Sequence, residues 1–83
     1  MFSEVAAVKE YYEILRELRE DLEPKPTQKE VGDKCSITQR KLSFIEKGIT
    51  EPNIQDLIAL CKFYGVSADY ILGLPYDLKR PER

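Results

Sequence analysis

Residues 27–48 read TQKEVGDKCSITQRKLSFIEKG, and this stretch decides the fold. Thr27 and Glu30 have the spacing of a capping box, in which each side chain bonds the other residue's backbone N–H where a helix begins. Val31 and Cys35 follow, four residues apart, and indicate one inward-facing side. The sequence therefore predicts a short helix over residues 28–35.

A second short helix follows after a tight turn. Thr38 is a suitable N-cap, and Gly48 supplies the left-handed residue that often ends a helix, so we predict a helix over 38–47. Leu42 and Ile45 share one side, which we expect to face the core. The other side carries a phenylalanine among polar and basic side chains: Gln39, Arg40, Ser43, Phe44 and Lys47.

Three further helices are predicted, over residues 5–23, 54–64 and 68–72. Pro24 and Pro26 stop the first one. Its apolar stripe comprises Val8, Tyr11, Leu15, Leu18 and Leu22. The expected buried side of 54–64 comprises Ile54, Leu57, Ile58, Cys61 and Tyr64. Asn53 and Asp56 cap the helix over 54–64, and Ser67 caps the helix over 68–72. No stretch shows the alternation of apolar and polar residues that a half-buried strand would have. We expect one all-α domain over residues 1–74 and a polar tail or linker over 75–83.

Composition and charge limit the class of protein. The chain has 83 residues and a net charge of −2, which is typical of one small soluble domain. No run approaches the roughly 18 apolar residues that would span a membrane, and we expect a cytoplasmic location. The charge is uneven, because residues 24–50 carry six basic and three acidic side chains, a local net charge of +3. Such a local patch, more than the total, governs binding to a polyanion.

Catalytic and metal-binding patterns do not occur in the sequence. Histidine is absent, and Cys35 and Cys61 match no metal spacing. The two cysteines form either a disulfide or two buried free thiols, and their apolar surroundings favour the thiols. We therefore expect no cofactor, no metal and no enzymatic activity.

The ordered series TQKEVG, ITQRKLSFIEKG and YGVSADYILG resembles the Cro/lambda-repressor-like (Xre-type) helix-turn-helix family. The resemblance implies a five-helix domain in a prokaryotic or phage-type DNA-binding protein. Ser36 stands where the family usually has glycine in the turn, and Gly32 stands where it usually has alanine. Gly32 reflects either close approach by another helix or neutral drift. The link before Thr27 is about two residues longer than usual.

The side chains of residues 38–47 suit the major groove of DNA. Glutamine pairs with adenine, arginine with guanine, and an apolar group packs on the thymine methyl. We expect base contacts from Thr38, Gln39, Arg40, Ser43 and Phe44. The resemblance points to the same part of this helix.

Phosphate contacts are expected at the rim, from Gln28, Lys29, Lys41 and Lys47. In relatives the glutamine that matches Gln28 binds phosphate and can brace the glutamine that matches Gln39. Relatives also pair the glutamate that matches Glu46 with an arginine of the first helix. Arg19 is the first candidate for that arginine, and Arg16 is the second.

Structural alternatives stay open for these residues. Phe44 either reads bases or folds back onto the domain, and Gln28 either binds phosphate or only supports the cap. Arg40, Lys41 and Lys47 either bind DNA or form an ordinary solvated face.

We expect a sequence-specific transcriptional regulator of the repressor type that binds double-stranded DNA as a homodimer on a pseudo-palindromic site. Tyr70, Ile71, Leu72 and Leu74 either close the core or form the dimer surface. The alternative function is a protein-interaction module or an antitoxin-type protein on the same fold, which the acidic first helix favours.

Overall fold

The computed structural model describes residues 9–74, and in this part of the chain it contains five helices and no strand. They are α1 (Tyr11–Glu20), α2 (Gln28–Cys35), α3 (Gln39–Glu46), α4 (Ile54–Tyr64) and α5 (Ala68–Leu72). The predicted all-α fold with five helices is confirmed, and α2, α4 and α5 have the predicted bounds. Residues 75–83 lie outside the described residues, so the domain boundary at residue 74 stays a prediction.

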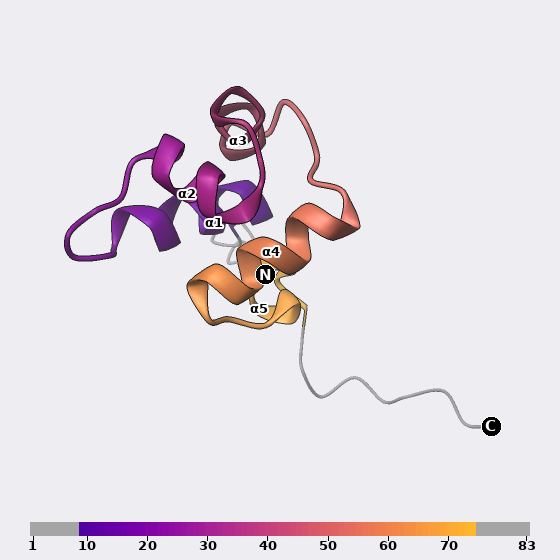
Figure 1. Cartoon of the computed structure of the whole chain (residues 1–83). Coiled ribbons are helices and arrows are strands. Elements are labelled where there is room, and N and C mark those ends of the chain that lie inside the picture. Colours follow the sequence, from indigo (N-terminus) through magenta and orange to yellow (C-terminus); the bar gives the residue numbers. More distant parts are fainter. Residues whose placement is uncertain (1–8, 75–83) are drawn as a thin grey trace.

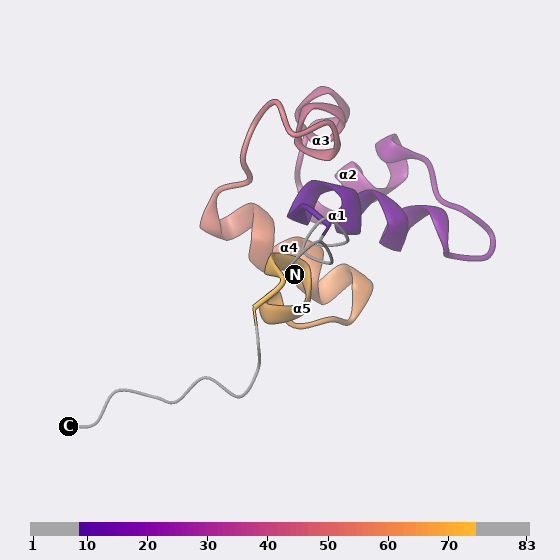
Figure 2. The same ribbon diagram turned by 180° about the vertical axis from the view of Figure 1, so that it is seen from behind.

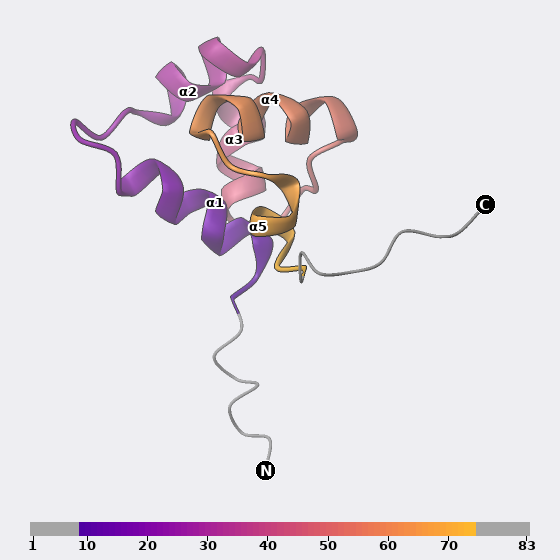
Figure 3. The ribbon, with the colours of Figure 1, turned by 90° about the horizontal axis from the view of Figure 1, so that it is seen from below.

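The helices surround one small core. α2 packs against α3 and α4, α1 against α3 and α5, and α4 against α5. In Figures 1 and 2, α3 lies at the top of the domain and α5 at the bottom. Seen from below, α4 and α5 lie in front of α3 (Figure 3). All five helices contribute to this core, and so does the turn between α2 and α3. The cluster comprises Leu15, Val31, Cys35, Ile37, Leu42, Ile45, Leu60 and Ile71.

α1 is shorter than the predicted helix over residues 5–23. It begins at Tyr11, where the carboxylate of Glu13 accepts a hydrogen bond from the backbone N–H of Glu10 at 2.9 Å. It ends at Glu20, four residues before Pro24, which has no N–H to donate to the Glu20 carbonyl and also disfavours helical backbone at Glu23. Leu22 is consequently outside the helix and 41% exposed, so the apolar stripe ends at Leu18. Residues 5–8 of the prediction, Val8 among them, lie outside the described residues.

The turn between α2 and α3 is tight, although it lacks the usual glycine. Ser36 adopts the left-handed conformation, with φ 60° and ψ 38°. The next residue, Ile37, donates its N–H to the Gly32 carbonyl at 2.9 Å, which folds the turn back onto α2. A Cβ atom on Gly32 would collide with the backbone carbonyl oxygen of Ile37. Close packing therefore requires glycine at this position, and the backbone that approaches it belongs to the turn and not to another helix.

α3 begins and ends one residue inside its predicted bounds of 38–47. Thr38 is the N-cap, and its hydroxyl accepts a hydrogen bond from the Lys41 N–H at 3.1 Å. Lys47 is the C-cap, and Gly48 follows with a φ of 77°. A side chain on Gly48 would also meet the ring of Tyr12 at 2.8 Å. The start and the end of α3 thus follow from the capping chemistry that the sequence carries.

The predicted buried side of α4 is wrong in part. Ile54 is 68% exposed and Ile58 43% exposed, whereas Leu60 and the carboxylate of Asp56 are buried. The buried stripe is centred on Leu60, about 100° around the helix from the predicted one. The reason is that α4 must face α2 and α5, and the cap at its start directs Asp56 into the domain.

Candidate nucleic-acid interface

The outer side of α3 carries the predicted base-reading set on a rigid support. Leu42 and Ile45, on the inner side, are 1% and 0% exposed and anchor the helix in the core. Three members of the predicted set are exposed and two are half-buried: Thr38, Gln39 and Arg40, then Ser43 and Phe44. All five side chains therefore keep surface that another molecule can reach.

Arg40 and Phe44 contact each other on this surface. The Arg40 guanidinium carbon lies 5.5 Å from the centroid of the Phe44 ring, within the range of a cation–π interaction. Phe44 is half-buried, yet it does not belong to the apolar side chains packed against the core of residues 9–74. The ring is therefore partly accessible and lies beside the arginine.

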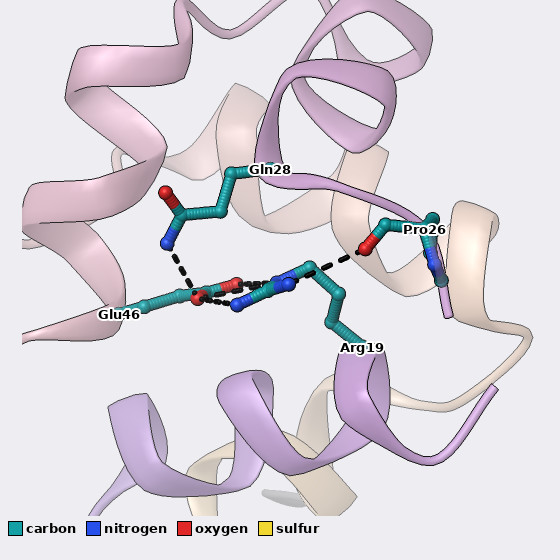
Figure 4. A network of polar contacts seen from close by, with 4 residues as sticks. All are labelled: Arg19, Pro26, Gln28 and Glu46. Atoms are coloured by element: carbon teal, nitrogen blue, oxygen red, sulfur yellow. Dashed lines mark hydrogen bonds and ion pairs between the residues drawn. The ribbon is translucent and has the colours of Figure 1, made fainter.

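A buried ion pair fixes α3 to α1 (Figure 4). Arg19 of α1 donates from Nε to Glu46 Oε2 and from Nη2 to Glu46 Oε1, both at 2.9 Å. Glu46 is 2% exposed, and Arg19 also donates from Nη1 to the Pro26 carbonyl at 3.3 Å. The hydrogen bonds to Glu46 raise the pKa of Arg19 above its ordinary value. Of the two arginines predicted for this pairing, Arg19 is the partner.

Gln28 completes the same network. Its amide Nε2 donates to Glu46 Oε1 at 2.9 Å, so α2, α3 and α1 meet at one carboxylate (Figure 4). The bond uses one of the two amide N–H groups and leaves the other N–H and the carbonyl oxygen for a further partner. The structure thus places Gln28 against Glu46, where the resemblance suggested a brace for Gln39. The Glu46 contact of this glutamine was not predicted, and no local pattern in the sequence signals it.

The four residues predicted to bind phosphate have different surroundings. Lys41 Nζ pairs with Asp56 Oδ2 at 2.7 Å, and Lys29 Nζ pairs with Asp33 Oδ2 at 3.1 Å on the surface. Lys47 is exposed at the end of α3 and forms no ion pair among residues 9–74. The Lys41–Asp56 pair was missed, because the sequence suggested only a capping role for Asp56. Lys41 retains two further N–H donors beside α3.

Other kinds of site are not seen in the described part of the chain. Residues 9–74 contain no group of three or more histidine, cysteine or acidic side chains that could hold a metal ion. Within the same residues, no helix combines the length and the apolar character needed to cross a bilayer. Cys35 and Cys61 are free thiols, as predicted, although Cys61 is only half-buried. Burial raises the pKa of both.

Comparisons with known proteins agree with this geometry. A family model described as helix-turn-helix matches residues 15–71. The chain is 40% identical over 56 residues to the HTH-type transcriptional regulator ImmR of Bacillus subtilis (strain 168), which covers 68% of this chain and 44% of that protein. The chain therefore spans less than half the length of that curated relative. The P22 c2 repressor protein, solved in complex with synthetic operator 9T in the presence of Tl+, superposes with a TM-score of 0.72 at 31% identity. That match covers 78% of this chain and 96% of the repressor chain.

Proposed function

Because the chain belongs to the helix-turn-helix family, we propose that it is a sequence-specific DNA-binding transcriptional regulator of the repressor type. The observation that carries the proposal is the outer side of α3, which presents Gln39, Arg40 and Phe44 while its inner side is locked in the core. Likeness to a repressor solved on its operator supports the same function.

In the proposed complex, α3 enters the major groove. It has 8 residues, and the diameter of an α-helix with its side chains, about 10–12 Å, suits a groove about 12 Å wide. Gln39 presents a donor and an acceptor that pair with adenine, and the Arg40 fork pairs with guanine. Thr38 and Ser43 lie beside them with hydroxyl groups.

Phosphate binding in the proposed complex comes from the rim of this surface. Lys47 supplies a cation at the end of α3 that pairs with no carboxylate among residues 9–74, and Lys29 lies in an exposed ion pair that phosphate can replace. Gln28 lies in the first turn of α2, where free backbone N–H groups favour an anion, and its second amide N–H is available. Lys41 keeps its bond to Asp56 and donates a further N–H.

A homodimer on a pseudo-palindromic site is the proposed assembly. Exposed apolar side chains that a second copy could cover gather on α4, on α5 and after it: Ile54, Ile58, Tyr70, Leu72 and Leu74. Ile71, by contrast, is fully buried and closes the core. Light scattering after gel filtration, with and without DNA, tests the assembly. Ile58→Lys should abolish the dimer, whereas Leu22→Lys, at a similarly exposed residue, should not. Binding of a single copy to an isolated half-site by the unaltered chain would refute it.

The test of the DNA-binding function is selection of bound sequences from random DNA, followed by affinity measurements over a range of salt. We expect a palindromic sequence, and an affinity that falls with a slope of about −0.9 per neutralised phosphate in a plot of log K against log salt. A partner-binding protein on the same fold would select no sequence and would show little dependence on salt. The cytoplasmic location proposed for this chain is compatible with DNA binding and with partner binding.

Two substitutions separate base reading from phosphate binding. Arg40→Ala should cost about 1–3 kcal/mol of binding free energy on the selected sequence and loosen the preference at one base pair. Lys47→Ala should weaken binding to selected and random DNA alike. Identical effects of the two substitutions on both kinds of DNA would show that this division of roles is wrong.

A further inference from the structure

Arg40 and Phe44 form a joint surface unit on α3. They are four residues apart, one helical turn, and the guanidinium carbon lies 5.5 Å from the ring centroid. The core cluster of the described residues does not include Phe44, and Arg40 is exposed. A flexible arginine is thereby held against an aromatic support before any ligand binds.

Both side chains keep surface that a ligand can reach, because Arg40 is exposed and Phe44 is half-buried. The five N–H donors of a guanidinium lie along the edges of its plane, and Arg40 forms no ion pair among residues 9–74. Such an edge pairs with O6 and N7 of guanine in the major groove. The phenyl ring is apolar, and the apolar group that the major groove offers to it is the C5 methyl of a pyrimidine.

The contact also restricts which base pairs the two side chains can reach together. Stacked base pairs follow one another at about 3.4 Å. Two side-chain groups 5.5 Å apart therefore fall within two steps of rise, about 6.8 Å, which places base pairs further apart than that beyond their joint reach. A guanine beside a methylated pyrimidine satisfies both groups at once.

We propose that Arg40 and Phe44 read a two-base-pair step as a unit, one guanine and a neighbouring 5-methylpyrimidine, so that binding depends on the C5 methyl group. The inference rests on the proposed function and specifies its ligand. Thymine and 5-methylcytosine carry the same methyl group, so the chemistry covers both bases. Cytosine methylation would then change the affinity of a site that holds cytosine at this position.

The experiment uses the full chain and synthetic duplexes that carry the sequence it selects from random DNA. Each thymine is replaced singly by deoxyuridine, which removes only the methyl group, and each guanine by 7-deazaguanine, which removes the N7 acceptor. Fluorescence anisotropy at constant salt gives Kd. Loss of one methyl contact should weaken binding about fourfold, at a thymine adjacent to a guanine that is also sensitive. When both bases are replaced, the loss should be smaller than the product of the two single losses.

A second arm identifies the source of the methyl group. The sensitive thymine–adenine pair is replaced by cytosine–guanine, with and without a methyl group on the cytosine. The methylated duplex should bind more tightly than the unmethylated one, by about the factor that separates thymine from deoxyuridine. Equal binding of these two duplexes would show that thymine recognition does not depend on the methyl group alone. It would overturn the proposal that 5-methylcytosine is recognised in the same way as thymine.

Two variants connect the methyl effect to Phe44. Phe44→Ala should reduce the deoxyuridine effect to less than about twofold. Circular dichroism shows whether this variant keeps its helices. Phe44→Leu keeps an apolar contact but lacks the aromatic face. For this variant, deoxyuridine should still weaken binding, but the loss with both bases replaced should equal the product of the two single losses.

The possible failures are distinguishable. If the chain selects no sequence, the proposed function and this inference fail together. If it selects a sequence but no thymine is methyl-sensitive, or the sensitive thymine and guanine are not neighbours, only the inference fails. Unchanged coupling between the two bases in Phe44→Leu would likewise overturn the joint reading.

Discussion

Replacement of Glu46 by methionine tests whether one buried carboxylate holds three helices together. The carboxylate accepts from Arg19 at two oxygens and from Gln28, and it is 2% exposed. Methionine has a similar volume but cannot accept these bonds. The Arg19 guanidinium, whose side chain is 11% exposed, then remains in the domain without its counter-charge.

The expected loss is large for so small a domain. Removal of one partner from a buried ion pair costs about 3–5 kcal/mol. At about 0.05–0.15 kcal/mol per residue, a chain of 83 residues has a total stability of about 4–12 kcal/mol. Glu46→Met should therefore remove about a quarter or more of the stability, and at a total stability in the lower part of that range it would leave the domain largely unfolded.

Urea unfolding followed by circular dichroism measures the loss, and a double-mutant cycle isolates the pair. Arg19→Met alone should also be costly, because it leaves the carboxylate buried without its cation. The double variant should be less destabilised than the sum of the single variants by at least about 2 kcal/mol, since two apolar groups can replace a buried pair.

An exposed ion pair in the same protein provides the control. Lys9 Nζ lies 2.7 Å from Glu17 Oε2, a shorter distance than in the buried pair, but both side chains are about half exposed. Glu17→Met should leave the unfolding midpoint nearly unchanged, because solvent screens the exposed pair. A loss below about 1 kcal/mol for Glu46→Met, or additive effects in the cycle, would refute the reasoning.

The remaining predictions concern the turn and the core. Gly32→Ala should lower stability by about 1–2 kcal/mol in urea unfolding, because overpacking against the Ile37 carbonyl exceeds the gain in helix propensity. Ser36→Gly should raise the thermal midpoint, since glycine adopts the left-handed conformation without the Cβ penalty; a decrease would show that this turn is unstrained. Tyr64→Phe should stabilise the domain by about 1 kcal/mol in the same urea assay, because the Tyr64 hydroxyl is buried without a hydrogen-bond partner among residues 9–74. Burial raises the pKa of Tyr64 above its ordinary 10.0, so the folded protein keeps a proton that the unfolded chain loses, and stability should fall as pH rises above about 10. Thermal unfolding between about pH 8 and 11 should show a smaller fall for Tyr64→Phe than for the unaltered chain, and equal falls would contradict the assignment.

Most helix boundaries could be read from the sequence, because the chemistry that sets them is local. Thr27, Thr38, Asn53 and Ser67 each accept a hydrogen bond from a backbone N–H three residues ahead, as their sequence positions predicted. The signal was weakest at α1, where a glutamate precedes the helix and the apolar stripe continues beyond it to Leu22. The predicted start and end of that helix were accordingly too generous.

The candidate surface was predictable for a related reason. Leu42 and Ile45 fix which side of α3 is buried, and the spacing of the other residues then places Gln39, Arg40 and Phe44 outward. The contact between Arg40 and the Phe44 ring, by contrast, is known only from the structure.

What the sequence determined by itself is therefore where α2 to α5 begin and end, to within one residue, and which side of α3 faces the core, because these depend on bonds and spacings within a few residues. Only the tertiary structure decided that Ile54 and Ile58 face outward, that Asp56 binds Lys41, and that Gln28 meets Glu46. An apolar stripe on α4 is ambiguous until α2 and α5 occupy one of its sides, and a carboxylate selects its partners from groups that are distant in sequence. Such choices are set by the positions of whole helices, which no local pattern contains.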